Sequence, residues 1–321
     1  MKILVTGGAG FIGSHYVRRL LAGGCPGSPD VQVTVLDNLT YAGKIANLPD
    51  EHPRLKFVKG DVCDQDLLFG LLPEHDAVVH FAAESHVDRS LVGAADFVRT
   101  NVLGTQNLLD SCVRVGVGMV VHVSTDEVYG SIERGTWTES EPLQPNSPYA
   151  ASKAGSDLIA RAFHQTYGLD VRITRCSNNY GPYQHVEKMI PLFVTNLLSG
   201  YAVPLYGDGE NVREWVHVDD HCQAIDRVLT YGEPGSIYNV GGGTILSNLE
   251  LTARLLELCD AGWDRVRRVS DRKGHDMRYA IDDSKIRQEL GWKPLWSFDD
   301  GLSKVVEWYR DHPEWWRTLQ R

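Results

Sequence analysis

Tyr149 and Lys153 stand four residues apart in the segment Tyr149-Ala150-Ala151-Ser152-Lys153. In a helix, this spacing places the phenol and the ammonium group on one face. A free tyrosine titrates near pH 10, so its phenol becomes a base at neutral pH only beside positive charge. The pair predicts proton abstraction by Tyr149 with help from Lys153, although this spacing taken alone is more often structural.

The segment Gly7-Gly8-Ala9-Gly10-Phe11-Ile12-Gly13 lies between an apolar run and a helical pattern. Glycines at these positions permit a tight turn and let the backbone approach a pyrophosphate at a helix N-terminus. A second apolar run ends in Asp37, whose carboxylate can bind a ribose. Because this carboxylate would repel a 2′-phosphate and no arginine follows it, we expect NAD rather than NADP. Asp61 and Val62 could flank the adenine, although an Asp after a strand is often only a turn residue.

Thr125, Asp126 and Glu127 follow an apolar run at its carboxyl end. Ligands bind at this end of the strands in open α/β sheets. Two acids beside a hydroxyl could supply the base and the acid that an elimination of water requires. Adjacent acids in a loop more often cap a helix or face solvent, so the spacing alone leaves both interpretations open.

The elements that would position these residues form a regular alternation of short β-branched runs and longer segments of helical period. This pattern is typical of parallel strands joined by crossover helices, and it predicts a doubly wound, Rossmann-type α/β sheet. The expected strands are Lys2–Thr6, Gln32–Asp37, Leu55–Lys59, Ala77–Phe81, Met119–Ser124 and Val171–Arg175. The expected helices include Phe11–Ala22, Ala94–Gly116 and Pro148–Tyr167.

After about residue 176 the alternation gives way to loops marked by Pro and Gly, such as Tyr180-Gly181-Pro182-Tyr183. We therefore predict that residues 1–176 form an NAD-binding domain that includes the helix of Tyr149 and Lys153. Residues 177–321 would form mainly a smaller substrate-binding portion, some segments of which could return to the sheet. For the aromatic residues near position 310, we expect a tail packed on the domain rather than a binding surface.

Composition limits the partners and the compartment. The formal net charge of −10 argues against a nucleic acid or an anionic membrane as partner. The chain opens at Met1 without a basic and then apolar leader, and it has no later apolar run of membrane-spanning length. Six cysteines without a C-x-x-C pair predict reduced thiols, no metal site and a cytoplasmic location. These are Cys25, Cys63, Cys112, Cys176, Cys222 and Cys259.

Several separate segments give the chain a resemblance to a known family. They are Ala82–Ser90 (AAESHVDRS), Thr125–Glu127 (TDE), Ser177–Gln184 (SNNYGPYQ) and Asp271–Tyr279 (DRKGHDMRY). Together with the glycine segment and the Tyr149–Lys153 pair, they make the chain similar to the nucleotide-sugar 4,6-dehydratases of the extended short-chain dehydrogenase/reductase family. The similarity runs from the first strand to nearly residue 300.

This resemblance implies a redox-neutral dehydration. Tyr149 would remove the proton of the sugar C4 hydroxyl, with Thr125 sharing the hydrogen bond and Lys153 holding the cofactor ribose. Glu127 would take the C5 proton and Asp126 would protonate the departing C6 oxygen. Because the hydride taken from C4 returns to C6, NAD would end unchanged, and we expect it to copurify. The implied substrate is a nucleotide sugar, dTDP-glucose.

The resemblance also implies two sets of binding residues and no metal. The cofactor set is Gly7, Gly10, Phe11, Ile12, Gly13, Asp37, Asn38, Leu39, Thr40, Asp61, Val62, Phe81, Ala82, Ala83, Ser85, Thr100, Tyr149, Lys153 and Asn179. The substrate set is Ser85, Thr125, Asn178, Lys188, Met189, Pro204, Tyr206, Arg213, Asn248, Asp271, His275, Arg278 and Tyr279. Arg213 is the leading candidate for the diphosphate, whereas His86 is as consistent with a structural role as with a functional one.

Three further expectations concern alternatives and assembly. A nucleotide-sugar 4-epimerase would use the same cofactor, Tyr149 and Lys153, but the acid pair argues against it. A non-catalytic NAD-binding sensor would be expected to lose the catalytic side chains, and all are present. The helices over Ala94–Gly116 and Pro148–Tyr167 resemble those through which this family forms a homodimer.

Overall fold

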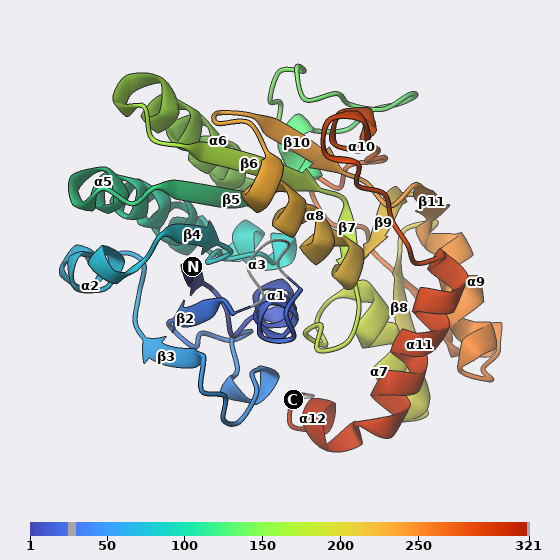
Figure 1. The fold of residues 1–321 in the computed structure, drawn as a ribbon. Coiled ribbons are helices and arrows are strands. Elements are labelled where there is room, and N and C mark those ends of the chain that lie inside the picture. The colour runs from blue at the N-terminus through green and yellow to red at the C-terminus, as the bar shows by residue number, and fades with distance from the viewer. Residues whose placement is uncertain (25–29, 320–321) are drawn as a thin grey trace.

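The fold is built around a parallel sheet whose strands come from residues 2 to 240. In the computed structural model, which describes residues 1–24 and 30–319, it has seven strands in the order β10-β6-β5-β4-β1-β2-β3 (Figure 1). All neighbouring strands are parallel. The strands are β1 (Lys2–Thr6), β2 (Gln32–Asp37), β3 (Leu55–Lys59), β4 (Ala77–His80), β5 (Met119–Thr125), β6 (Val171–Cys176) and β10 (Ile237–Val240). The predicted fold class is confirmed, and each of the six predicted strands ends within one residue of its expected limits.

The strand order reverses at β1. The chain first moves outward to β2 and β3 and then returns to the other side of β1, where β4 begins. Thr6, at the carboxyl end of β1, is in register with Leu36 on one side and His80 on the other. Loops after β1 and β4 therefore leave the sheet in different directions, and a crevice opens between them.

Helices cover both faces of the sheet, as a doubly wound fold requires (Figure 1). One face packs against α1 (Phe11–Leu21), α8 (Val218–Tyr231) and α10 (Ser284–Leu290). The other face packs against α2 (Gln65–Leu71), α5 (Thr105–Val115) and α6 (Pro148–Tyr167). Because both faces are covered, consecutive residues such as Ile3, Leu4 and Val5 are all fully buried. A sheet covered on one face only would instead show buried and exposed residues in alternation.

The helix expected over Ala94–Gly116 is helical throughout but not uniformly α-helical. It consists of α4 (Ala94–Phe97), a π-helical segment (Val98–Gly104) and α5. It ends as expected at Gly116, whose φ of +83° lies in the left-handed region and whose N–H bonds to Cys112 O at 2.9 Å. The π-helical segment contains Thr100 and Asn101, and Asn101 Oδ1 accepts from Glu84 N, in the loop after β4, at 2.8 Å.

The C-terminal portion builds a second hydrophobic core beside the sheet. Three strands, β7 (Asn178–Tyr180), β9 (Val212–His217) and β11 (Thr244–Ser247), form one small sheet, and β8 (Val203–Tyr206) pairs with β12 (Val266–Val269). The remaining α-helices are α3 (Val87–Val92), α7 (Met189–Leu198), α9 (Asn248–Leu258), α11 (Phe298–Asp311) and α12 (Pro313–Arg317). Short 3₁₀ turns lie at Ile45–Asn47, Leu72–Glu74, Asp126–Tyr129 and Trp263–Arg265. The aromatic C-terminal segment packs on this core, with Tyr309 and Trp316 buried.

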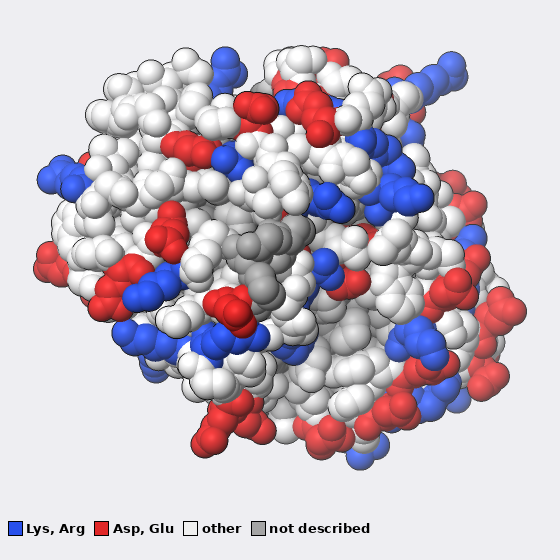
Figure 2. Space-filling view, in the orientation of Figure 1, with Lys and Arg blue, Asp and Glu red and all other residues white. Residues whose placement is uncertain are grey.

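Two further features are the distribution of charge on the surface and the state of the cysteines. In Figure 2, Lys and Arg are interspersed with Asp and Glu over the visible face. The five cysteines that the structure describes, Cys63, Cys112, Cys176, Cys222 and Cys259, are free, and Cys25 lies outside the described residues. Across residues 1–24 and 30–319, none of the helices combines the length and the apolar character needed to cross a membrane.

Candidate active site

The glycine segment forms a tight loop between β1 and α1. Gly7 has a φ of +68°, and a Cβ added there would lie 2.6 Å from the backbone nitrogen of Ala82. A Cβ on Gly13 would lie 2.3 Å from the carbonyl oxygen of Gly7. Gly10 is the N-cap residue of α1, so the first free N–H groups of that helix lie beside the loop. The absence of side chains at these positions is therefore a packing requirement of the loop.

Asp37 connects this loop with the end of β2. Its carboxylate accepts hydrogen bonds from Ala9 N at 2.9 Å and from Leu39 N at 2.8 Å. Burial raises the pKa of this carboxyl, whereas the two backbone bonds lower it. Leu39, which has a φ of +53°, packs against the core beneath α1. The loop and the predicted ribose-binding carboxylate thus form one connected unit.

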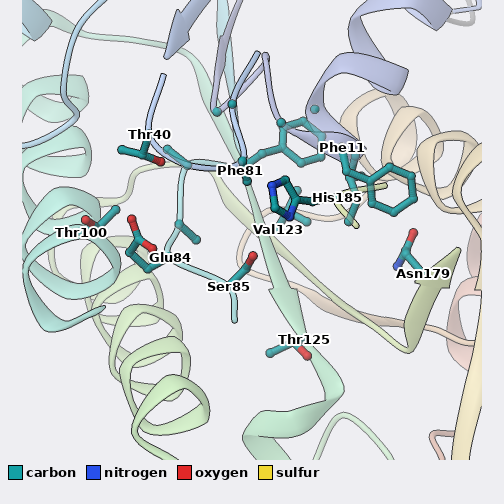
Figure 3. Close-up of a pocket in the computed structure, with 18 of the residues that line it drawn as sticks. Phe11, Thr40, Phe81, Glu84, Ser85, Thr100, Val123, Thr125, Asn179 and His185 are labelled. Carbon is teal, nitrogen blue, oxygen red and sulfur yellow. The ribbon is translucent and has the colours of Figure 1, made fainter. Parts of the chain in front are cut away.

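A cavity of about 300 Å³ lies at the carboxyl ends of the strands, beside this unit. We call it the first cavity. Every residue predicted for the cofactor lines it except Leu39. In Figure 3, Thr40 and Thr100 lie on one side of this space and Phe11 and Asn179 on the other. The sheet therefore brings together side chains from nearly two hundred residues of sequence at the crevice expected from the strand order.

Several residues of the first cavity were not predicted. They are Leu36, Tyr41, Ala42, Gly43, Gly60, Glu84, Val123, Ser124, Cys176, Ser177, Gln184, His185 and Glu187. Tyr41, His185 and Glu187 form a cluster in the lining of this space, with His185 5.6 Å from the Tyr41 ring and 3.8 Å from Glu187. The Arg89 guanidinium lies 3.8 Å over the Tyr41 ring, and its Nε donates to Glu187 Oε2 at 3.0 Å. Glu84 and Gln184 belong to segments that carried the family resemblance, which was the available signal for them.

Tyr149 and Lys153 lie on the first turns of α6 and line the first cavity. The helix begins where Ser147 caps it, accepting from Ala150 N, with Pro148 at its first position. Lys153 Nζ donates to Val123 O at 2.8 Å. Burial raises the pKa of Tyr149 well above its usual value, Glu127 and Cys176 add to this, and a hydrogen bond with Thr125 opposes it. The phenol therefore needs additional positive charge beside it before it can act as a base.

The acid pair lies on the 3₁₀ turn directly after β5. Thr125 Oγ1 donates to Asp126 Oδ1 at 3.2 Å and accepts from Glu127 N at 3.3 Å. Asp126 Oδ2 and Glu127 Oε2 are buried without a hydrogen-bond partner among the described residues. At least one oxygen of each carboxyl is thus shielded from bulk solvent, which argues against the interpretation that both acids simply face solvent.

The surroundings of the two acids differ in a way that suits opposite roles. Burial raises the pKa of Asp126 well above its usual value, and the neighbouring Glu127 and Glu214 add to this. Burial also raises the pKa of Glu127, but the cationic Arg272, Arg213 and Lys188 lower it. These surroundings favour the protonated form of Asp126 more strongly than that of Glu127.

A second cavity of about 180 Å³ adjoins the first. The two share four lining residues, Glu127, Asn178, Glu187 and Lys188. Residues of the predicted substrate set that line it are Asn178, Lys188, Met189, Pro204, Tyr206, Arg213, Asn248 and His275. Two others, Ser85 and Thr125, line the first cavity. The acid pair therefore stands where the two spaces meet.

Positive charge is concentrated around the second cavity. Lys188 Nζ donates to Ser85 O at 2.7 Å, and Arg213 Nη2 donates to Asp276 O at 3.0 Å. Arg213 is 5% exposed, and burial lowers its pKa. Arg272, which was not predicted, also lines this cavity and pairs with Asp88 at 3.2 Å. Arg213 is buried and Lys188 and Arg272 are partly buried, and together these cations provide a site for an anionic group.

Three residues of the predicted substrate set do not line either cavity. Tyr279 lies under the Arg213 guanidinium, 4.5 Å from it, and donates to Asp276. Asp271 accepts from His275 Nδ1 at 2.6 Å, so it contacts a lining residue. Arg278 Nη1 donates to Gly135 O at 2.7 Å. Unpredicted residues that line the second cavity are His86, Val87, Asp88, Glu187, Leu192, Phe193, Leu205, Trp215 and Arg272.

No cluster of three or more His, Cys, Asp or Glu residues suited to a metal ion occurs within the ranges that the structure describes. The side chains that meet at the junction are the hydroxyls, carboxyls and amines described above. They include a phenol and an ammonium group on one helix, a buried carboxyl and a second carboxyl among cations. Such a set can remove two protons and donate one.

Comparison with known proteins gives consistent results. Residues 4–305 match the family model described as GDP-mannose 4,6 dehydratase. The chain is 58% identical over 322 residues to a dTDP-glucose 4,6-dehydratase of Streptomyces niveus, covering all of this chain and 96% of the relative. It also resembles the crystal structure of the dTDP-glucose 4,6-dehydratase DesIV from Streptomyces venezuelae with NAD and TYD bound, with a TM-score of 0.99, 65% identity and full coverage of both chains. A UDP-glucose 4-epimerase from Thermotoga maritima is more distant, with a TM-score of 0.89, 31% identity and coverage of 97% and 99%.

Proposed function

We propose that this chain, which belongs to the GDP-mannose 4,6 dehydratase family, is an NAD-dependent dTDP-glucose 4,6-dehydratase. It converts dTDP-glucose to dTDP-4-keto-6-deoxyglucose and water. The observation that carries this function is the acid pair Asp126 and Glu127, which lines the first cavity with Thr125 and Tyr149 and reaches the second cavity through Glu127. An epimerase needs the phenol and the ammonium group but has no use for an acid and a base at C6 and C5.

The first cavity fits NAD. The glycine loop leaves no room for a side chain between β1, α1 and the loop after β4, so a diphosphate can approach the backbone. Asp37 is positioned for an adenosine ribose, and the N-terminus of α1 lies beside the loop. When bound, NAD supplies the acceptor for the C4 hydride and later returns that hydride to C6. The proton transfers of the reaction are carried out by side chains of this protein.

Oxidation at C4 requires removal of the hydroxyl proton, and Tyr149 is the base for this step. The pKa of its phenol is raised by burial, so deprotonation depends on Lys153 and on the positive charge of the oxidised cofactor. Thr125 orients the hydroxyl through the hydrogen bond it shares with the phenol. The product of this step is a ketone at C4.

The ketone acidifies the proton at C5, and elimination follows. Glu127, which Arg272, Arg213 and Lys188 favour in its ionised form, takes that proton. Asp126, which is kept protonated, gives its proton to the C6 hydroxyl, so that the C6–O bond breaks and water leaves. Reduction at C6 and reprotonation at C5 by Glu127 complete the 4-keto-6-deoxy sugar.

Isotopic labelling tests this function. Purified protein is given dTDP-glucose deuterated at C4, without added cofactor, and the product is analysed by mass spectrometry. Loss of water with deuterium at C6 is the expected result. Retention of water with deuterium at C4 would instead identify a 4-epimerase, and absence of any product from NAD-loaded protein would support a sensor.

We further propose that the protein is a cytoplasmic homodimer that pairs through the Val98–Gly104 segment, α5 and α6. Apolar side chains are exposed there, with Val98, Leu103 and Leu158 at 54%, 48% and 57%. Leu158→Lys should convert the dimer to a monomer in light scattering after gel filtration. Leu295→Lys, which alters a side chain that is 65% exposed on a different segment, is the matched control and should leave the mass unchanged. Equal masses for both variants would contradict this interface.

Two expectations of the sequence stay proposals of the same kind. The division into an NAD-binding domain over residues 1–176 and a mainly substrate-binding portion over 177–321 is supported by a core whose buried residues all lie beyond position 177. The expected return of later segments to the sheet is supported by α8, β10 and α10, which pack in the first core. The predicted binding sets are supported by the lining of the two cavities.

Alanine substitution of Arg213 should raise the KM for dTDP-glucose more than it lowers kcat, because a diphosphate contact acts in both the ground state and the transition state.

A further inference from the structure

Ala9, in the centre of the glycine loop, is held from both sides. Its N–H donates to Asp37 Oδ2 at 2.9 Å. Its carbonyl oxygen accepts from Lys44 N at 3.0 Å and from the side chain of Asn47, whose Nδ2 lies 2.8 Å away. Ala9 is fully buried, so water does not compete for these bonds. The position of the loop therefore depends on how firmly Asn47 itself is held.

Asn47 is fixed by a residue from the far end of the chain. The indole Nε1 of Trp315, on α12, donates to Asn47 Oδ1 at 3.0 Å. Asn47 is 2% exposed, and its backbone carbonyl accepts a hydrogen bond from Arg18 on α1. The side-chain amide thus uses its oxygen toward Trp315 and its nitrogen toward Ala9. Because the amide is planar, fixing its oxygen also directs its nitrogen.

Trp315 is in turn held by a cluster of aromatic rings, which we call the C-terminal aromatic cluster: Tyr183, Trp308 and Trp315. The Tyr183 ring lies 4.6 Å from Trp308 and 5.6 Å from Trp315, and the two indoles are 5.3 Å apart. The guanidinium of Arg18 lies 4.2 Å over the Tyr183 ring. In Figure 1, α12 lies beside the loop that follows β2. The C-terminal segment therefore contacts the part of the chain that supports the glycine loop.

We propose that Trp315 is a positioning residue for NAD, which acts through Asn47 on the Ala9 carbonyl and slows release of the cofactor. This proposal rests on the assignment of NAD to the first cavity. A loop that is already ordered loses little conformational freedom when the cofactor binds, and its N–H groups stay directed at the diphosphate. Slow release of NAD suits a redox-neutral cycle, since an enzyme that regenerates its cofactor in every turnover does not need to exchange it.

The test compares Trp315→Phe with Trp308→Phe. Both changes keep an aromatic ring in the C-terminal aromatic cluster, but only the first removes the N–H that donates to Asn47. Holoenzyme loaded with isotopically labelled NAD is chased with unlabelled NAD, and the rate of label release is measured. We expect Trp315→Phe to accelerate release by about two- to tenfold, the equivalent of one buried neutral hydrogen bond, and Trp308→Phe to change it by less than about twofold.

A second variant separates the relay from a general loss of stability. Asn47→Ala should release NAD at least as fast as Trp315→Phe, and the double variant should be no faster than Asn47→Ala, because both changes break one chain of contacts. The Tm of each cofactor-free variant is measured in parallel. Additive effects in the double variant, or release rates that merely follow the loss of Tm in both Trp variants, would overturn the proposal. A native protein that holds no labelled NAD would refute the proposed function instead.

Discussion

Replacing Asp126 with Asn separates the two halves of the proposed reaction. Asp126 is 2% exposed, and its Oδ1 accepts from Thr125. Asn has nearly the same size and keeps an oxygen for this hydrogen bond, so the turn after β5 should be preserved. It cannot transfer a proton to the leaving oxygen at C6. The variant therefore removes the acid and leaves the arrangement of Thr125, Glu127 and Tyr149 intact.

The expected magnitude follows from the role of the group. A general acid contributes about 10²- to 10⁴-fold to the step that it assists, which corresponds to roughly 3–5 kcal/mol in the barrier. The rate of water loss should fall by this factor. Oxidation at C4 should change little, because protonated Asp126 and Asn are both neutral, so the charge beside the Tyr149 phenol stays the same. The variant should therefore accumulate the 4-keto sugar beside reduced cofactor.

A single-turnover experiment measures both steps. NADH absorbance reports oxidation at C4, and mass spectrometry of quenched samples reports loss of water. The matched control is Glu127→Gln in deuterated water. The Asp126→Asn variant should still exchange the C5 proton of the ketone with solvent, because Glu127 is present, whereas Glu127→Gln should not. An equal fall in C4 oxidation and water loss in Asp126→Asn would refute the assignment of the acid.

Three other changes have defined outcomes. Tyr149→Phe should lower C4 oxidation by about 10²- to 10⁴-fold while the purified protein keeps its NAD, as measured by NADH absorbance and by the cofactor content of denatured protein. Asp37→Asn should weaken NAD binding by about 10- to 100-fold in calorimetry, because the charged acceptor of Ala9 N and of the ribose is lost. His221 is fully buried, its Nδ1 contacts Asn179, and burial lowers its pKa to about 3. Since an unfolded histidine binds protons near pH 6.5, the free energy of unfolding should fall by about 1.4 kcal/mol per pH unit between roughly pH 6 and 4, and His221→Gln should show a shallower slope in urea titrations.

Local sequence patterns predicted six strands of the main sheet well, because each of these strands has a recognisable pattern of its own. The strands of the doubly wound sheet are buried on both faces, so they appear in the sequence as short apolar runs between turn residues. The strand β10 was not predicted, because Ile237–Val240 is short and lies among loops, and only its pairing with β6 defines it. The π-helical turn of Val98–Gly104 was also missed, since hydrophobic periodicity does not distinguish it from an α-helix.

Sequence motifs could point only to those residues of the candidate site that belong to a motif. Residues inside motifs, such as Tyr149 and Glu127, line the cavities, whereas Arg278 bonds to Gly135 instead. Arg272 lies in the Asp271–Tyr279 segment that carried the resemblance, which was the available signal for it. Tyr41 enters the first cavity from a loop and has no local signature that separates it from an ordinary turn residue. Their positions depend on how distant segments pack, which is a property of the tertiary structure.

The pairing of β10 with β6 has a consequence for how the chain reaches its native state. About 60 residues separate the end of β6 at Cys176 from the start of β10 at Ile237. During synthesis at roughly 5–20 residues per second, the backbone edge of β6 stays unpaired for roughly 3–12 s after it is made. An exposed edge of a buried apolar strand is a template for aggregation. The C-terminal portion thus completes the sheet as well as the substrate site, and a chain truncated near residue 176 should be prone to aggregate on that edge.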